Sequence, residues 1–122
     1  MPRLKPELIE RVEMFADRVT DVAEELDRQG RFRRIVDQVV GSGTSVGANM
    51  CEADEALSRP DFCKTLGIVL RELSETRYWL RFVARRAWIK EARLQPLIEE
   101  CSELRAVCGS MLARTKKRGD KQ

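Results

Sequence analysis

The sequence predicts an all-α protein with a single domain, residues 1–122, that forms an antiparallel up-down-up-down four-helix bundle. Only 6% of the residues are aromatic and 35% are charged, and residues that favour helices, such as Leu, Ala, Glu and Arg, are common. Apolar residues recur at helical spacing in four segments that are joined by short connections. A chain of 122 residues is also long enough to enclose a hydrophobic core.

The first helix is predicted over about residues 5–28. Its apolar positions follow alternating steps of four and three residues, the heptad pattern of a helix that packs against partner helices. Gly30 then ends the helix, because glycine readily adopts the left-handed conformation found after helix C-termini. The heptad positions are Leu8, Val12, Phe15, Val19, Val22 and Leu26.

The other three helices are predicted over about residues 32–57, 59–88 and 91–116. The third begins at a capping box, in which Ser58 is the N-cap, Pro60 lies in the first turn and Asp61 is the acidic partner. The fourth carries an apolar stripe from Leu94 to Met111. Residues 117–122 are rich in Lys and Arg and are predicted to form a frayed basic tail.

The segment Val40–Ala53, VGSGTSVGANMCEA, places three glycines inside the second helix. It matches neither the dinucleotide-binding nor the Walker A pattern, so we expect no nucleotide cofactor. Three glycines within a helix cost roughly 2–3 kcal/mol, which close packing should offset. We expect the third helix, around Tyr78 and Trp79, to pack there, with the hydroxyls of the glycine segment donating to Glu72 or Glu75. Packing within the bundle and a subunit interface both remain open.

The residue types present argue against catalysis and metal binding. The chain has no His, which excludes His-dependent triads and His metal sites. Its four cysteines (Cys51, Cys63, Cys101 and Cys108) lack zinc-site spacing and are expected to be buried free thiols. We therefore predict a non-enzymatic protein without metal or cofactor. No apolar window long enough for a membrane span and no signal peptide are found, so we expect a cytoplasmic location.

Positive charge is concentrated in the second half of the chain. Residues 1–61 carry 9 Lys+Arg against 13 Asp+Glu, whereas residues 62–122 carry 14 against 7. Such asymmetry suggests a basic face for a polyanion, or complementary faces for self-association. One basic end of the bundle is expected from Arg31, Arg33, Arg34, Arg81, Arg85, Arg86 and Lys90. Arg77 begins a stripe that continues through Arg81 and Arg85, and Lys116, Lys117 and Arg118 should lie at the opposite end.

Aromatic residues are interleaved with these cations. Trp79, Phe82 and Trp88 could stack on bases where they are exposed, or could instead pack in the core or a subunit contact. The arginines could equally pair with acids of the first helix. The sequence by itself leaves these alternatives open.

The strings SGTSVGANMCEA, SRPDF and LRELSETRYWLRF resemble the four-helix bundle proteins encoded in 23S rRNA intervening sequences. The resemblance covers about residues 30–90 well and the outer helices by pattern. It departs at Ala53, where glycine is usual, and at Gly41, where a basic residue is common. The corresponding positions are Ser42, Ser45, Val46, Asn49, Glu52, Phe62, Ser74, Glu75 and Leu80.

The resemblance implies a ring-like homo-oligomer, a pentamer in this family, and a similarity to accessory proteins of diversity-generating retroelements. Those are basic pentamers that engage a reverse transcriptase and nucleic acid. We therefore expect a binder of structured RNA or DNA, or of a nucleic-acid enzyme. The alternative is an oligomeric scaffold that binds only protein. Its interface would use Ser42, Ser45, Asn49, Glu52, Glu72, Glu75, Tyr78 and Trp79.

Overall fold

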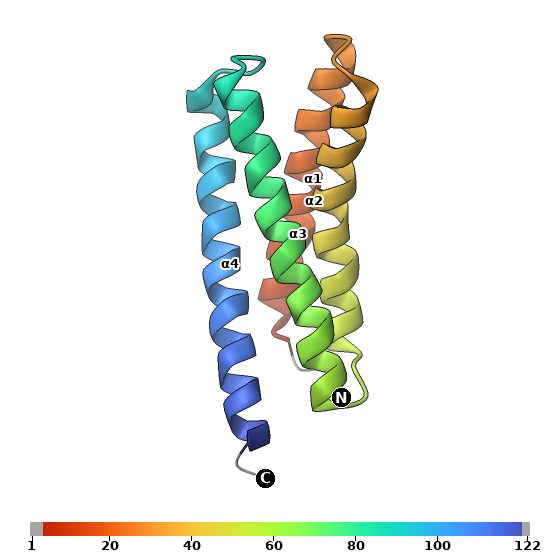
Figure 1. The fold of residues 1–122 in the computed structure, drawn as a ribbon, viewed down its shortest axis with the longest axis vertical. Coiled ribbons are helices and arrows are strands. Elements are labelled where there is room, and N and C mark those ends of the chain that lie inside the picture. The colour runs from red at the N-terminus through yellow and green to blue at the C-terminus, as the bar shows by residue number, and fades with distance from the viewer. Residues whose placement is uncertain (1–3, 121–122) are drawn as a thin grey trace.

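The computed structural model describes residues 4–120, in which there are four helices and no strand. The helices are α1 (Pro6–Arg28), α2 (Arg33–Asp54), α3 (Arg59–Arg85) and α4 (Glu91–Asp120). The α1–α2 and α3–α4 connections lie at one end of the molecule, and the α2–α3 connection lies at the other (Figure 1). The prediction of a small, single-domain, all-α protein with four helices is confirmed. None of the helices within residues 4–120 is long and apolar enough to cross a membrane.

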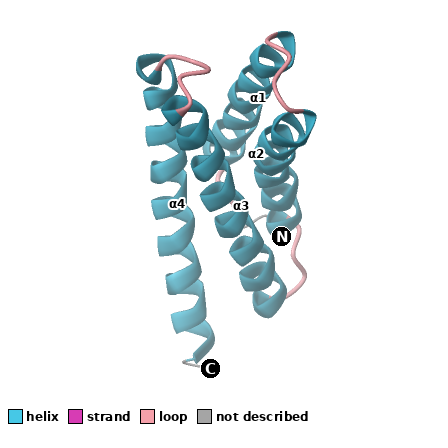
Figure 2. Cartoon of the chain, turned by 45° about the horizontal axis from the view of Figure 1, so that its top comes forward, coloured by secondary structure: helices cyan, strands magenta, loops and turns pink. Residues whose placement is uncertain are grey.

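The core runs along the bundle and receives apolar side chains from all four helices. Phe15, Val46, Leu73 and Leu104 are among its fully buried members. Helices that follow one another in the sequence pack extensively against each other, whereas α1 and α4 contact each other much less. The view in Figure 2 shows the four helices with short connecting loops. Of the predicted heptad positions of α1, Val12, Phe15, Val19 and Leu26 are buried, whereas Leu8 and Val22 are half-buried.

Two helices end in the same hydrogen-bonded motif. After α1, Gly30 has a φ of 71°, its N–H donates to the Asp27 carbonyl, and the Arg31 N–H donates to the Leu26 carbonyl. These bonds define a Schellman motif, which satisfies carbonyls that the helix end leaves free. The predicted stop at Gly30 is confirmed.

The end of α3 repeats the motif without a glycine. Ala87 has a φ of 56°, its N–H donates to the Ala84 carbonyl, and the Trp88 N–H donates to the Val83 carbonyl. Helix α3 therefore ends at Arg85, before the predicted end at residue 88. Alanine gives no sequence signal for this conformation, since its Cβ disfavours it.

The remaining helix boundaries show one confirmation and two corrections. The Ser58 side chain accepts a hydrogen bond from the Asp61 N–H at 3.1 Å, as the capping box predicts. Helix α2 ends at Asp54 instead of residue 57, because the chain must leave the helix before it reaches this cap. Helix α4 begins at Glu91, as expected, but continues to Asp120, so the predicted frayed tail is helical over residues 117–120. Residues 121–122 lie outside the described part of the chain.

The glycine segment is helical throughout, but its close neighbour is α1 and not α3. A Cβ placed on Gly43 would lie 2.4 Å from Cγ1 of Val19 in α1. At Gly47 the nearest atom would be Cγ1 of Val12 at 3.8 Å, and at Gly41 nothing lies within 4 Å. Gly43 thus supports packing within the bundle, and the expectation that α3 fills this site is wrong.

Polar contacts join the start of the described chain to the end of α2, and join α1 to α4. The Leu4 N–H donates to Oδ1 of Asp54 at 3.0 Å. Arg11 of α1 donates to both carboxylate oxygens of Glu100 in α4, at 2.8 and 2.6 Å, and to Oε2 of Glu103 at 2.6 Å. This cluster connects α1 and α4 where apolar contact between them is limited.

Candidate nucleic-acid interface

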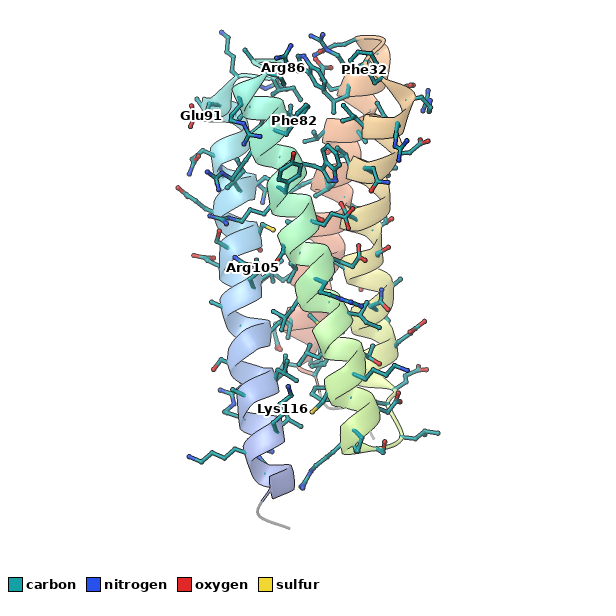
Figure 3. The ribbon with its side chains drawn as sticks, in the orientation of Figure 1. Phe32, Phe82, Arg86, Glu91, Arg105 and Lys116 are labelled. Atoms are coloured by element: carbon teal, nitrogen blue, oxygen red, sulfur yellow. The ribbon has the colours of Figure 1, made fainter. Side chains whose placement is uncertain are left out.

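The end of the bundle that carries the α1–α2 and α3–α4 connections is rich in arginine. Arg31, Arg33 and Arg34 lie at the first connection, and Arg85, Arg86 and Lys90 lie at the second. Figure 3 shows Phe32 and Arg86 at this end. All of these cationic side chains are exposed except Arg31, which is half-buried. The two connections are thus close enough for their charges to act on one polyanion.

A chain of aromatic rings lies beside these cations. Tyr78 meets Trp79 edge-on with ring centroids 5.0 Å apart, and Trp79 meets Phe82 at 5.7 Å. Phe82 in turn meets Trp88 at 5.5 Å. Tyr78 is 52% exposed, whereas the other three rings are half-buried. Among these four rings, Tyr78 therefore offers the most accessible face.

Guanidinium groups lie over three of these rings. Cζ of Arg31 is 4.7 Å from the centroid of the Trp88 ring. Cζ of Arg85 is 6.0 Å from the Tyr78 ring and 5.9 Å from the Phe82 ring. Such cation–π contacts orient the guanidinium without neutralising it. We call Arg31, Tyr78, Trp79, Phe82, Arg85 and Trp88 the arginine–aromatic cluster.

The two connections are fixed to each other by a hydrogen bond as well. Nε2 of Gln29, in the α1–α2 connection, donates to the Trp88 carbonyl at 2.9 Å. The Schellman motifs after α1 and α3 set the positions of both partners. Sequence reasoning placed Arg31 and Trp88 near this end but missed their contact, since loop geometry determines it.

The other cations that the sequence predicts to bind nucleic acid differ in their exposure and in their ion pairs. Arg33 pairs with Asp27 and also lies 3.7 Å from Asp37, so part of its charge is compensated. Arg77 is half-buried, and its Nε is buried without an acceptor among the described residues. Arg81 and Arg34 are exposed and form none of the ion pairs found within residues 4–120. The strongest candidates for phosphate contacts are therefore Arg34, Arg81, Arg85, Arg86 and Lys90.

Lys116, Lys117 and Arg118 lie near the end of α4, away from the arginine–aromatic cluster. Figure 3 places Lys116 toward the end of the bundle opposite to Arg86. All three side chains are exposed. They form a separate basic region, as the sequence predicts for an up-down bundle.

The predicted interface residues of α2 bond mainly to their own helix. Oγ of Ser42 donates to the Val39 carbonyl, and Nδ2 of Asn49 donates to the Ser45 carbonyl at 2.9 Å. The hydroxyl of Thr44 donates to the Val40 carbonyl at 2.7 Å. The expectation that the hydroxyls of Ser42 and Thr44 reach Glu72 or Glu75 is wrong, because carbonyls one turn earlier are nearer. Glu52 is exposed near the end of α2.

In α3, two acidic residues of the same predicted interface lie one turn apart, with Glu72 half-buried and Glu75 exposed. Burial raises the pKa of Glu72, and the nearby Glu75 carboxylate raises it further. Nε1 of Trp79 is buried with no acceptor among the described residues. On the α4 side, Ser74 accepts a hydrogen bond from Nε of Arg105 at 3.1 Å.

Two of the four cysteines are buried, and two are accessible to solvent. Cys101 and Cys108 are buried, which raises their pKa values to about 12 and about 11, and Sγ of Cys101 donates to the Leu73 carbonyl. A thiol with such a pKa is a poor nucleophile. Cys51 is exposed and Cys63 half-buried, so the prediction of four buried cysteines is correct for two. Residues 4–120 hold no group of three or more His, Cys, Asp or Glu side chains that could bind a metal ion.

Comparison with known proteins identifies a family that includes this chain and solved structures that resemble it. The model of the family described as 23S rRNA-intervening sequence protein matches residues 5–110. The chain is 32% identical to a protein with unknown function from the S23 ribosomal protein family of Bacteroides thetaiotaomicron, known from a crystal structure. The two structures align with a TM-score of 0.82 over 86% of this chain and 97% of that one. No curated protein matches the chain.

Proposed function

The chain belongs to the 23S rRNA-intervening sequence protein family, and from this premise we propose that it is a non-enzymatic binder of structured nucleic acid. The proposed contact surface is the arginine–aromatic cluster together with Arg34, Arg81, Arg86 and Lys90. In this proposal the antiparallel up-down-up-down bundle is the repeating subunit of a ring-like homo-oligomer, which is pentameric and acts in the cytoplasm. It acts alone or beside a nucleic-acid enzyme such as a reverse transcriptase.

The observation that carries the proposal is the combination of free arginines with an accessible aromatic face. Arg85 lies over Tyr78, whose ring is 52% exposed, and neither residue takes part in the ion pairs found within residues 4–120. Arginine binds phosphate through a planar fork, and exposed aromatic rings stack on unpaired bases. Repetition of this surface around a ring would multiply the number of phosphate contacts.

The proposal is tested by fluorescence anisotropy with a labelled RNA hairpin and a labelled DNA duplex. Because binding would release counterions from the phosphates, affinity should fall by orders of magnitude between about 50 and 200 mM salt. Arg81→Glu with Arg85→Glu should abolish binding and leave the circular dichroism spectrum unchanged, since both side chains are exposed. The matched control is Lys64→Glu with Arg71→Glu, the same charge change on exposed positions of α3 outside the cluster.

Tyr78→Ala separates stacking from charge. If a base stacks on Tyr78, its loss should weaken binding by about 1–3 kcal/mol without changing the salt dependence. Equal loss of affinity in the control double variant would refute the assignment of the surface. Absence of binding at low salt would refute nucleic-acid binding itself and favour a protein-only scaffold.

A further inference from the structure

A cleft of about 640 Å³ opens at the end of the bundle opposite to the arginine–aromatic cluster. It lies between the start of α1, the start of α3 and the last turns of α4, on the side where α1 and α4 make few contacts. Its volume falls within the range of about 300–1,000 Å³ that is typical of small-molecule sites. Its lining residues are Leu4, Lys5, Leu8, Arg59, Phe62, Val107, Met111, Arg114, Thr115 and Arg118.

Half of the residues that line the cleft are aliphatic or aromatic. Leu4 and Phe62 are buried and belong to the core, and Leu8 and Met111 are half-buried against it. Val107 is 37% exposed at the α4 side. These side chains form the apolar part of the lining, which could hold an alkyl chain.

Among the described residues, the cleft is lined by four cationic side chains and by no carboxylate. Lys5, Arg59, Arg114 and Arg118 all line it, and none of them takes part in the ion pairs found within residues 4–120. Nη1 of Arg59 is buried and has no hydrogen-bond acceptor among the described residues. A buried donor without an acceptor is unfavourable.

From this combination we propose that the cleft binds an aliphatic phosphate monoester. The phosphate would be held by Arg59, Arg114 and Arg118, and the alkyl chain would lie on Leu8, Phe62 and Met111. A phosphate monoester carries a charge of about −1.5 to −2 near neutral pH, which matches a cluster of several cations better than a single carboxylate does. The guanidinium fork also fits phosphate oxygens in pairs.

The proposal is tested by isothermal titration of the full chain with octyl phosphate, below the concentration at which it forms micelles. Saturable binding at one site per chain is expected. Inorganic phosphate and octanol should each bind much more weakly, because inorganic phosphate lacks the alkyl chain and octanol lacks the phosphate. Adenosine monophosphate should also bind more weakly, because its polar ribose and purine would replace the alkyl chain on Leu8, Phe62 and Met111.

Arg114→Gln with Arg118→Gln should weaken octyl phosphate binding at least about tenfold, the expected effect of losing charge-assisted hydrogen bonds. Val107→Asp, which places a carboxylate in the partly exposed wall, should have a similar effect. The matched control is Arg18→Gln with Arg71→Gln, because it removes the same charge from exposed positions outside the cleft. That variant should bind as the unmodified protein does.

Four outcomes would overturn the proposal. They are no saturable binding of octyl phosphate, equal affinity for octyl phosphate and inorganic phosphate, equal affinity for octyl phosphate and adenosine monophosphate, and equal weakening in the control variant. Light scattering on each variant adds a further criterion. A change in subunit number caused by the Arg114 and Arg118 substitutions would show that the cleft is a contact between copies of the chain. The outcome of this titration does not depend on whether the arginine–aromatic cluster binds nucleic acid, because the cleft lies at the opposite end of the bundle. The control substitutions also lie outside that cluster.

Discussion

Gly43→Ala tests the closest approach between two helices in the bundle. The added Cβ would lie 2.4 Å from Cγ1, 2.8 Å from Cβ and 3.2 Å from Cγ2 of Val19. Carbon atoms in ordinary contact are about 3.5–4.0 Å apart, so α1 and α2 would have to separate by roughly 1 Å. Val19 is fully buried and β-branched, which prevents its side chain from rotating away.

The expected change in stability is the sum of two opposing effects. Over-packing of a core typically costs about 1–3 kcal/mol. Because the added Cβ would come closest to both Cγ1 and Cβ of Val19, this site lies toward the upper part of that range. Replacing a helical glycine with alanine returns about 1 kcal/mol. Gly43→Ala should therefore lower the free energy of unfolding by about 1–2 kcal/mol.

Gly41→Ala is the matched control. It lies two residues away in the same helix, and a Cβ there would meet nothing within 4 Å. Only the helix-propensity gain applies, so this variant should be more stable than the unmodified protein by about 1 kcal/mol. The changes in unfolding free energy of the two variants should thus have opposite signs, although both replace a glycine with an alanine.

The assay is urea denaturation followed by far-UV circular dichroism, with all variants at one protein concentration because association would add to stability. Adding Val19→Ala to Gly43→Ala should cost less than the two separate changes predict, with a coupling of at least about 0.5 kcal/mol. If Gly43→Ala is as stable as Gly41→Ala, the close contact between Gly43 of α2 and Val19 of α1 is refuted.

Three further predictions concern helix ends and the α1–α4 contact. Ala87→Gly should stabilise the protein by about 0.5–1 kcal/mol in thermal unfolding, because glycine adopts the left-handed conformation with little strain. Ser58→Ala should destabilise it by about 1 kcal/mol, whereas Ser58→Asp should restore the cap to Asp61. The hydrogen bond from Arg11 lowers the pKa of Glu100. This bond therefore stabilises the folded protein fully above the ordinary carboxyl pKa, and its contribution is lost as pH falls through the lowered pKa of Glu100. The stability difference between the unmodified protein and Glu100→Gln should therefore shrink as pH is lowered from about 7 to about 3, and a constant difference would contradict the assignment.

Local chemistry accounts for the features that could be read from the sequence. Apolar spacing predicts the four helices because burial of a helix face requires that period. The Ser58 cap and the Gly30 stop were readable because each motif uses residue types suited to it. Ala87 carries no such signal, so the end of α3 was missed.

The candidate site depended more on tertiary geometry. The sequence indicates which arginines gather near the two connections, since the predicted up-down order would bring those connections to one end of the bundle. It does not indicate the rotation of each helix about its axis, which decides that Gly43 faces Val19 instead of α3. The same limitation applies to the cleft, whose cations come from the starts of α1 and α3 and the end of α4.

The unequal packing of the four helices has a consequence for folding. α1 and α4 each pack extensively against only one neighbour, whereas α2 and α3 each pack against two. Because most contacts join helices that are adjacent in the sequence, the chain closes few long loops, which is typical of proteins that fold within microseconds to milliseconds. Amide hydrogen exchange should then be slowest in α2 and α3 and faster in α1 and α4. The outer helices would open in partial unfolding events while the central pair stays closed.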